Sequence, residues 1–120
     1  MPAGAPRIVV TEARGASLAL ARQESTRFIA PIEQCIATAQ RADPLAYSRV
    51  PLANVVVHLA SDGAATAIDI DPSDLAHGLS QCLATALLPW HHAGHTALRA
   101  TLHVLVGLNG QPLSRAAIAR

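Results

Sequence analysis

One stretch of sequence occurs twice in this chain at a constant offset of 47 residues. Residues 34–39 read Gln-Cys-Ile-Ala-Thr-Ala, and residues 81–86 read Gln-Cys-Leu-Ala-Thr-Ala. The same offset relates the Asp-Gly pair at residues 62–63 to the Asn-Gly pair at 109–110. A helix-like segment, a strand-like segment and a turn therefore occur twice. This pattern predicts two related halves, too few for an open solenoid, against the alternative of chance similarity in a chain rich in Ala and Leu.

Each half begins with a segment whose apolar residues recur at helical spacing. The first helix is expected to begin near Ser25 or at Pro31, and to end at residues 43–44, because the residue before a proline avoids the helical conformation. The second is expected to have Asp71 as N-cap and Pro72 as its first residue. The apolar stripes are Phe28, Ile29, Ile32, Cys35, Ile36 and Ala39, and Leu75, Leu79, Cys82, Leu83, Ala86 and Leu87.

Strand-like segments follow both helices. Residues 52–60 and 64–70 flank a Ser-Asp-Gly turn and predict a β-hairpin, and residues 98–108 predict a further strand before the Asn-Gly turn. Residues 7–11 are expected to add an edge strand. The prediction is one α+β domain over residues 1–120, a two-layer sandwich with two helices on one face of a mainly antiparallel sheet. The expected order of elements is α-β-β-α-β(-β). The chain is expected to consist of an N-terminal segment (1–24), a first half (25–71) and a second half with a C-terminal tail (72–120).

Alternation along these strands assigns residues to the two sheet faces. Val55, Val57 and Leu59, together with Leu98, Ala100, Leu102, Val104 and Val106, are expected to face the helices. The opposite face is the predicted partner-binding surface, and its candidates are His58, Arg99, Thr101, His103 and Leu105.

Composition excludes several classes of function. Phe, Trp and Tyr occur once each and the formal net charge is +1, so neither a basic patch nor a stacking platform for nucleic acid is expected. No apolar run is long enough to span a membrane. The start of the chain lacks the pattern of a signal peptide, which leaves a cytoplasmic protein or a domain of a longer exported chain. No cofactor is predicted.

The two cysteines, Cys35 and Cys82, occupy equivalent positions on the two helices. Equivalent residues meet if they lie near a pseudo-two-fold axis, and adjacent positions on packed helices suit a disulfide. Two reduced, buried cysteines are the alternative. Neither cysteine has the sequence surroundings of a catalytic thiol, and their spacing is not that of a zinc site.

The order of these motifs resembles the C-terminal domain of AgmX/PglI-type proteins, which is similar to the TonB C-terminal domain. The resemblance covers residues 32–106 and is carried by Cys35, Cys82, the Asp-Gly turn and the Leu-Pro-Trp run at 88–90. It implies a non-enzymatic, exported cell-envelope or gliding-motility module with paired cysteines. The chain departs from the family where residues 91–95 read His-His-Ala-Gly-His, and the family's preceding membrane anchor is absent.

The remaining candidate chemistry is a group of histidines. His91, His92 and His95 fall within five residues, and imidazoles are ligands for Zn, Ni or Cu, but a solvated loop is the preferred interpretation because no nearby carboxylate completes a metal site. No catalytic motif occurs, so the chain is not expected to be an enzyme.

The sequence therefore predicts a periplasmic or cell-envelope domain that binds a protein or peptide. Strand addition to the open edge of the strand at 98–108 is the expected mode, because Pro112 interrupts the return strand after the Asn-Gly turn. The alternatives are a cytoplasmic domain that forms a homodimer through its sheet, and a metal-binding protein that uses the histidine loop.

Overall fold

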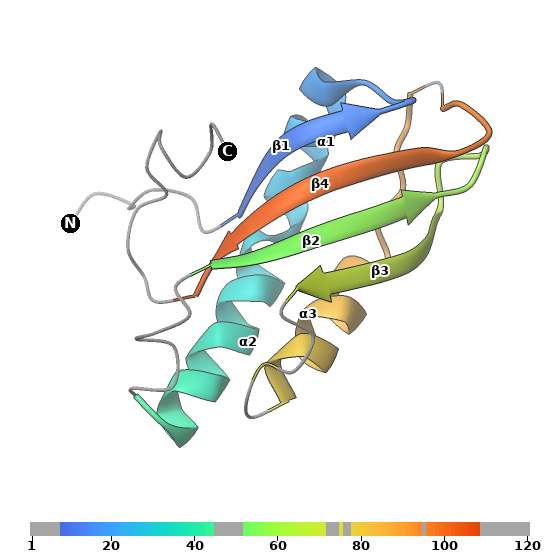
Figure 1. Cartoon of the computed structure of the whole chain (residues 1–120). Helices are drawn as coiled ribbons and strands as arrows, with labels where there is room; N and C mark the ends of the chain where they lie inside the picture. Colours follow the sequence, from blue (N-terminus) through green and yellow to red (C-terminus); the bar gives the residue numbers. More distant parts are fainter. Residues whose placement is uncertain (1–7, 45–51, 72–74, 76–77, 95, 109–120) are drawn as a thin grey trace.

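The computed structural model describes residues 8–44, 52–71, 75, 78–94 and 96–108. The elements are β1 (Ile8–Arg14), α1 (Leu18–Ser25), the 3-10 turn η1 (Thr26–Phe28), α2 (Ile29–Ala42), β2 (Leu52–Leu59), β3 (Ala65–Asp71), α3 (Leu79–Leu87) and β4 (Ala100–Gly107). The strands form one antiparallel sheet in the order β1-β4-β2-β3, and the helices cover one of its faces (Figure 1). The predicted α+β class is confirmed.

The core lies between the sheet and the helices and is almost entirely aliphatic. Alternate side chains are buried along β2 and in the first half of β4, as the period-2 pattern predicts, whereas residues 104–107 of β4 are all buried. The fully buried helix residues include Ile32, Ile36, Leu79, Leu83 and Leu87. The prediction is wrong for Leu98, which precedes β4 and is 83% exposed.

Two pairs of residues with the 47-residue spacing are in contact. Cys35 in α2 is joined to Cys82 in α3 by a disulfide, with 5.9 Å between the Cα atoms. Val56 in β2 lies opposite His103 in β4. Both pairs have the geometry expected for equivalent residues near an approximate two-fold axis that relates α2-β2 to α3-β4. The register β2–β4 agrees, because Val55 and Val57 pair with Val104 and Leu102.

The start of α3 differs from the prediction. Asp71 is the last residue of β3 and pairs with Asn54, so it is not a helix cap. The helix begins at Leu79, after Gly78 with φ +72°, and Pro72 lies outside the described residues. Pairing with β2 extends β3 as far as Asp71, and this pairing outweighs a local capping preference of about 1 kcal/mol.

The N-terminal segment contains a helix that was not expected. The edge strand predicted there is present as β1, but it is followed by α1, which Ser17 caps by accepting a hydrogen bond from the Leu20 amide at 3.2 Å. The 3-10 turn η1 then leads into α2, in which Pro31 is the third residue. A proline is tolerated there because amides of the first helical turn have no partner within the helix.

The predicted open edge is wrong. β4 lies inside the sheet, paired with β1 on one side and β2 on the other, so no partner strand can add to it. On the outer face of β4, Leu105 is buried, whereas Thr101 and His103 are polar and half-buried. The Asn-Gly turn and the tail expected after β4 lie outside the described residues.

Candidate interaction site

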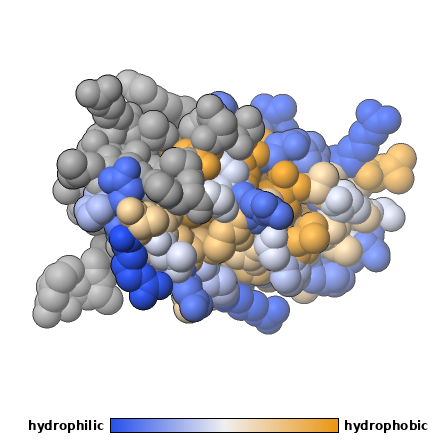
Figure 2. All heavy atoms as spheres, turned by 90° about the horizontal axis from the view of Figure 1, so that it is seen from below, coloured by the Kyte–Doolittle hydropathy of each residue, from blue (hydrophilic) through white to orange (hydrophobic). Residues whose placement is uncertain are grey.

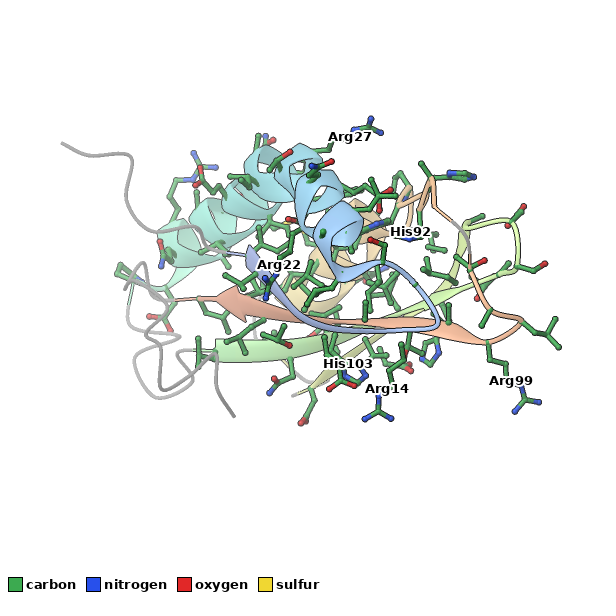
Figure 3. The ribbon with its side chains drawn as sticks, turned by 90° about the horizontal axis from the view of Figure 1, so that it is seen from above. Arg14, Arg22, Arg27, His92, Arg99 and His103 are labelled. Atoms are coloured by element: carbon green, nitrogen blue, oxygen red, sulfur yellow. A yellow bond between two sulfur atoms is a disulfide. The ribbon has the colours of Figure 1, made fainter. Side chains whose placement is uncertain are left out.

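The edges of the sheet are β1 and β3, and they differ in what covers them. At β1, the Arg22 side chain of α1 donates a hydrogen bond from Nε to the Val10 carbonyl at 3.1 Å. A side chain that occupies a carbonyl at the edge hinders an approaching strand. Figure 3 shows Arg22 beside this edge. The β1 edge is therefore protected in part by the molecule itself.

Among the described residues, contacts to the β3 edge occur at its beginning. The Ala65 amide donates to the Trp90 carbonyl at 3.0 Å, and Ala64 forms an isolated bridge with His91. For residues 66–71, β2 is the only strand partner among the described residues. About 20 Å of strand edge is thus open to a further strand.

A groove runs beside this open edge. It has a volume of about 340 Å³ and lies between β3 and α3, lined by Ile68, Asp69, Ile70, Ser80, Gln81 and Ala84. Figure 2 looks at the molecule from below, the side on which Figure 1 places β3 and α3, and shows hydrophobic atoms reaching the surface on this side. Ile68 and Ile70 are half-buried there, opposite the buried Val57 and Val55 of β2.

The predicted partner-binding residues lie on or near the outer face, but they do not form one cluster. His103 lies at its centre between Glu12 and Val56, and Thr101 lies between Arg14 and His58. Arg99 is exposed in the loop before β4, and Figure 3 shows Arg14, Arg99 and His103 on the side of the sheet away from the helices. Leu105 is buried at 6% exposure, so it offers a partner little surface.

The outer face carries charges of both signs. Next to His103, the hydrogen bond from Arg14 holds the pKa of Glu12 below its usual value, and the nearby charges of Arg14 and His103 act in the same direction. On the other side of the face, His58 Nε2 lies 2.6 Å from Asp69 Oδ2 of β3. His58 is thus the one predicted candidate that contacts the open edge strand.

His92 is buried, against the expectation of a solvated histidine loop. Its side chain is 1% exposed; Nδ1 lies 2.8 Å from Glu24 Oε1, and Nε2 accepts a hydrogen bond from the Ser17 amide at 3.3 Å. Since an amide can only donate, Nε2 accepts and Nδ1 carries the hydrogen. Both ring nitrogens are occupied, so His92 is not available as a metal ligand. His91 is exposed, and His95 lies outside the described residues.

Glu24 of α1 is the buried partner that the sequence reasoning missed. Its carboxylate accepts hydrogen bonds from Trp90 Nε1 at 3.2 Å, from His92 Nδ1 and from the Ala93 amide at 2.8 Å. Burial raises the pKa of Glu24, but these hydrogen bonds outweigh burial, so the pKa lies below its usual value. Glu24 lies three residues after Ala21 and four residues before Phe28, and this helical spacing was the available signal that its side chain faces inward.

Gly63 fixes the hairpin turn against the segment that carries His92. Its φ is +91°, and a Cβ there would lie 2.0 Å from the His92 carbonyl oxygen. Gly78 also has a positive φ, +72°, but a Cβ there would meet nothing within 4 Å. Substitutions at the two glycines can therefore distinguish the cost of a left-handed backbone from the cost of steric overlap.

We expect Gly63→Ala to destabilise the domain more than Gly78→Ala does. Both variants incur the left-handed penalty of about 1–2 kcal/mol, and Gly63→Ala adds an overlap of about 1–3 kcal/mol. Urea denaturation of the two variants measures the difference. Equal losses in the two variants would contradict the tight contact between the turn and the His92 segment.

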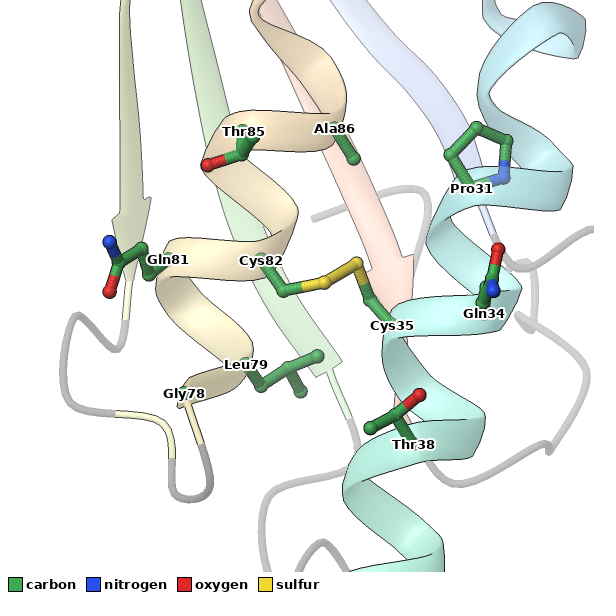
Figure 4. A pocket seen from close by; sticks show the side chains of 10 residues that line it. All are labelled: Pro31, Gln34, Cys35, Thr38, Gly78, Leu79, Gln81, Cys82, Thr85 and Ala86. Carbon is green, nitrogen blue, oxygen red and sulfur yellow. A yellow bond between two sulfur atoms is a disulfide. The ribbon is translucent and has the colours of Figure 1, made fainter.

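The disulfide lies at the surface between α2 and α3. Cys35 is 6% exposed, whereas Cys82 is exposed, so the expected inward position is wrong for Cys82. The bridge forms part of the wall of a second groove, of about 560 Å³ (Figure 4). The other lining residues are Pro31, Gln34, Thr38, Gly78, Leu79, Gln81, Thr85 and Ala86, none of which is charged.

Three further findings bear on function. Within the described ranges, no three His, Cys, Asp or Glu side chains are grouped as a metal site would require. No helix in the same ranges has the length and hydropathy needed to cross a membrane. Comparison of the chain with models of protein families, with curated proteins and with solved structures finds no match in any of the three.

Proposed function

We propose that this chain is a non-enzymatic interaction domain that binds a protein or peptide partner by strand addition at β3. The observation that carries the proposal is the open edge at residues 66–71, directly beside a groove that accepts side chains. An added strand would gain main-chain hydrogen bonds from the edge, and every second side chain would enter the groove. The outer-face residues His58 and Asp69 would contact the side chains that point the other way.

The buried polar groups support a binding role over catalysis. Glu24 and His92 are the buried ionisable pair among the described residues, and their hydrogen bonds join α1 to the segment before β4. Such a network serves the fold, because its atoms face one another inside the protein and not a cleft. The two grooves carry neither of these groups in their lining.

The disulfide supports an oxidising compartment as the place of action. Disulfides persist in exported proteins and are rare in the cytosol, where thiols are kept reduced. The order of motifs that resembles the AgmX/PglI and TonB C-terminal domains supports the same compartment. We therefore propose a domain of an exported, cell-envelope protein.

The test uses peptides selected from a displayed library of random ten-residue sequences. Hydrogen exchange of the protein with a selected peptide is expected to show new protection at residues 66–71. Ala84→Met should weaken binding about tenfold or more, because a larger side chain on α3 fills the groove beside β3. Ala37→Met, on the exposed face of α2, is the matched control and should bind as the native protein does.

Two outcomes would overturn the proposal. In the first, selected peptides protect β1 or the groove between α2 and α3 and leave residues 66–71 unchanged. In the second, residues 66–71 are protected without peptide in a dimer that forms as the protein concentration rises. The second outcome would favour a sheet-mediated homodimer.

A further inference from the structure

The open part of β3 alternates between two kinds of side chain. Ile68 and Ile70 point to the helix side and line the groove with α3. Asp69 and Asp71 point to the outer face, opposite Val56 and Asn54 of β2, and both are exposed. A strand that adds to β3 must place its own alternate side chains beside these two rows.

The groove side of this edge selects apolar side chains. Ile68, Ile70 and Ala84 form its apolar wall, and α3 contributes no charged residue over its whole length. Asp69 also lines this groove, but its side chain is on the outer face beside His58, so a charged side chain in the groove would lose water against the apolar wall. The added strand therefore needs small apolar residues at every second position.

The outer side of the edge selects basic side chains. Opposite charges on directly facing strand positions attract, and like charges repel. The nearest arginine within a strand is Arg14 in β1, three strands away, which is about 14 Å and beyond a Debye length of about 8 Å. His58 Nε2 lies 2.6 Å from Asp69 Oδ2, so one histidine faces the two carboxylates of Asp69 and Asp71, and this part of the edge has an acidic character.

The same charges disfavour a second copy of β3 as the occupant. Ala64 and Ala65 are engaged with residues 90–91, so two copies would pair through residues 66–71. Four carboxylates, two from each copy, would then lie on neighbouring positions of one sheet face. The partner is more favourably a different chain that carries positive charge.

We infer that the partner segment of this domain is an extended stretch in which small apolar and basic side chains alternate. This inference rests on the proposed strand addition at β3 and adds the chemistry of the strand that is added. The apolar residues enter the groove between β3 and α3. The Lys or Arg residues lie over the outer face beside Asp69 and Asp71.

Three synthetic peptides test this inference. One alternates lysine and valine, one alternates glutamate and valine, and one has the composition of the first with its lysines grouped at one end. In fluorescence anisotropy, the alternating lysine peptide is expected to bind roughly tenfold tighter than the glutamate peptide, from two charge pairs worth about threefold each. The grouped peptide should bind more weakly than the alternating one, because only an alternating strand can place valines in the groove and lysines beside Asp69 and Asp71 at the same time.

Charge-removing variants of the protein complete the test. Asp69→Asn with Asp71→Asn should remove most of the difference between the lysine and glutamate peptides. Asp71→Asn alone should reduce the ratio of the two peptide affinities about threefold. Glu33→Gln removes an exposed charge on α2, and as the control it should leave this ratio unchanged. Raising the salt concentration should weaken binding of the lysine peptide to the native protein more than to the double variant.

The ways in which the inference can fail are distinguishable. If the glutamate peptide binds as tightly as the lysine peptide and protects residues 66–71 from hydrogen exchange, the inferred partner chemistry is wrong and strand addition stands. If the grouped lysine peptide binds with the same affinity as the alternating one, the attraction is nonspecific and the inference is wrong. If no library or synthetic peptide protects residues 66–71, both the inference and the proposed function are wrong.

Discussion

Glu24→Ala is expected to lower the free energy of unfolding by about 3–5 kcal/mol. The substitution leaves three donors without their acceptor: the buried indole N–H of Trp90, the buried Nδ1–H of His92, and the Ala93 amide, whose hydrogen bond is part-buried. Each buried donor that loses its partner costs about 1–3 kcal/mol. At roughly 4 °C per kcal/mol for a chain of this size, the melting temperature should fall by about 12–20 °C.

Glu24→Gln refines the measurement. The amide oxygen accepts from two of the donors, but the amide nitrogen then faces the third, so the loss should be smaller, about 2 kcal/mol. Glu33→Gln on the exposed face of α2 is the control and should shift the melting temperature by less than about 2 °C. A melting temperature of Glu24→Ala within that same margin would show that the buried network is not essential.

The same network makes stability depend on pH. The pKa of Glu24 lies below its value of 4.5 in the unfolded chain, because of its hydrogen bonds. The stabilisation from Glu24 is therefore complete above about pH 4.5 and is lost as the pH falls through the lower, folded pKa. Denaturant unfolding between pH 7 and pH 3 should show this loss in the native protein and a smaller loss in Glu24→Gln.

Removal of the disulfide is expected to cost about 4 kcal/mol. Cys35 and Cys82 close a loop of 47 residues, and the chain-entropy model assigns about that stabilisation to a loop of this length. The variant Cys35→Ala with Cys82→Ser suits the two environments, because Cys35 is buried and Cys82 is exposed. Its melting temperature should fall by roughly 15 °C.

Reduction of the native protein provides the matched comparison. Because Cys82 is exposed, dithiothreitol should reach the bridge in the folded protein and lower the melting temperature toward that of the double variant. The variant itself should not respond to dithiothreitol. Complete alkylation of both cysteines in air-exposed native protein without reductant would contradict the bridge and the exported location proposed from it.

Local patterns were sufficient for the class of fold. The period of 2 around Val55 and Val57 predicted β2 and its buried face, and the Asp-Gly pair at 62–63 predicted the hairpin. The repeated cysteines predicted that two equivalent helices lie side by side. The strand and the hairpin depend on residues close together in the sequence, and the pairing of helices depends on the 47-residue repeat. Both kinds of pattern can be read directly from the sequence.

The order of the strands was not accessible in the same way. Whether β4 is an edge or a central strand depends on β1, which pairs with it from more than 85 residues away in sequence, as in Ile8 with Val106. The expectation of an open edge at β4 considered only the weak segment after that strand. The strand with an edge open to addition is therefore β3 and not β4.

The buried network was missed for a related reason. α1 has no continuous apolar stripe, because it buries Glu24 and Ser25 beside Ala21. The spacing of Glu24 from Ala21 and Phe28 marks an inward-facing position, but the donors that stabilise a carboxylate there, on Trp90, His92 and Ala93, come together only in the tertiary structure. The expectation of a solvated histidine loop is wrong for His92 for the same reason, whereas His91 is exposed.

By itself, the sequence determined the α+β class, the β2–β3 hairpin and the aliphatic character of the core, and it offered the pairing of Cys35 with Cys82 beside the alternative of two reduced cysteines. Each follows from short-range periodicity or from a repeat, where the physics of side-chain alternation acts on adjacent residues. Tertiary structure alone decided which strand is open, which histidine is buried and which face of α3 borders a groove. These properties arise when segments distant in sequence compete for the same hydrogen-bonding groups and the same surface, and no local pattern records the outcome of that competition.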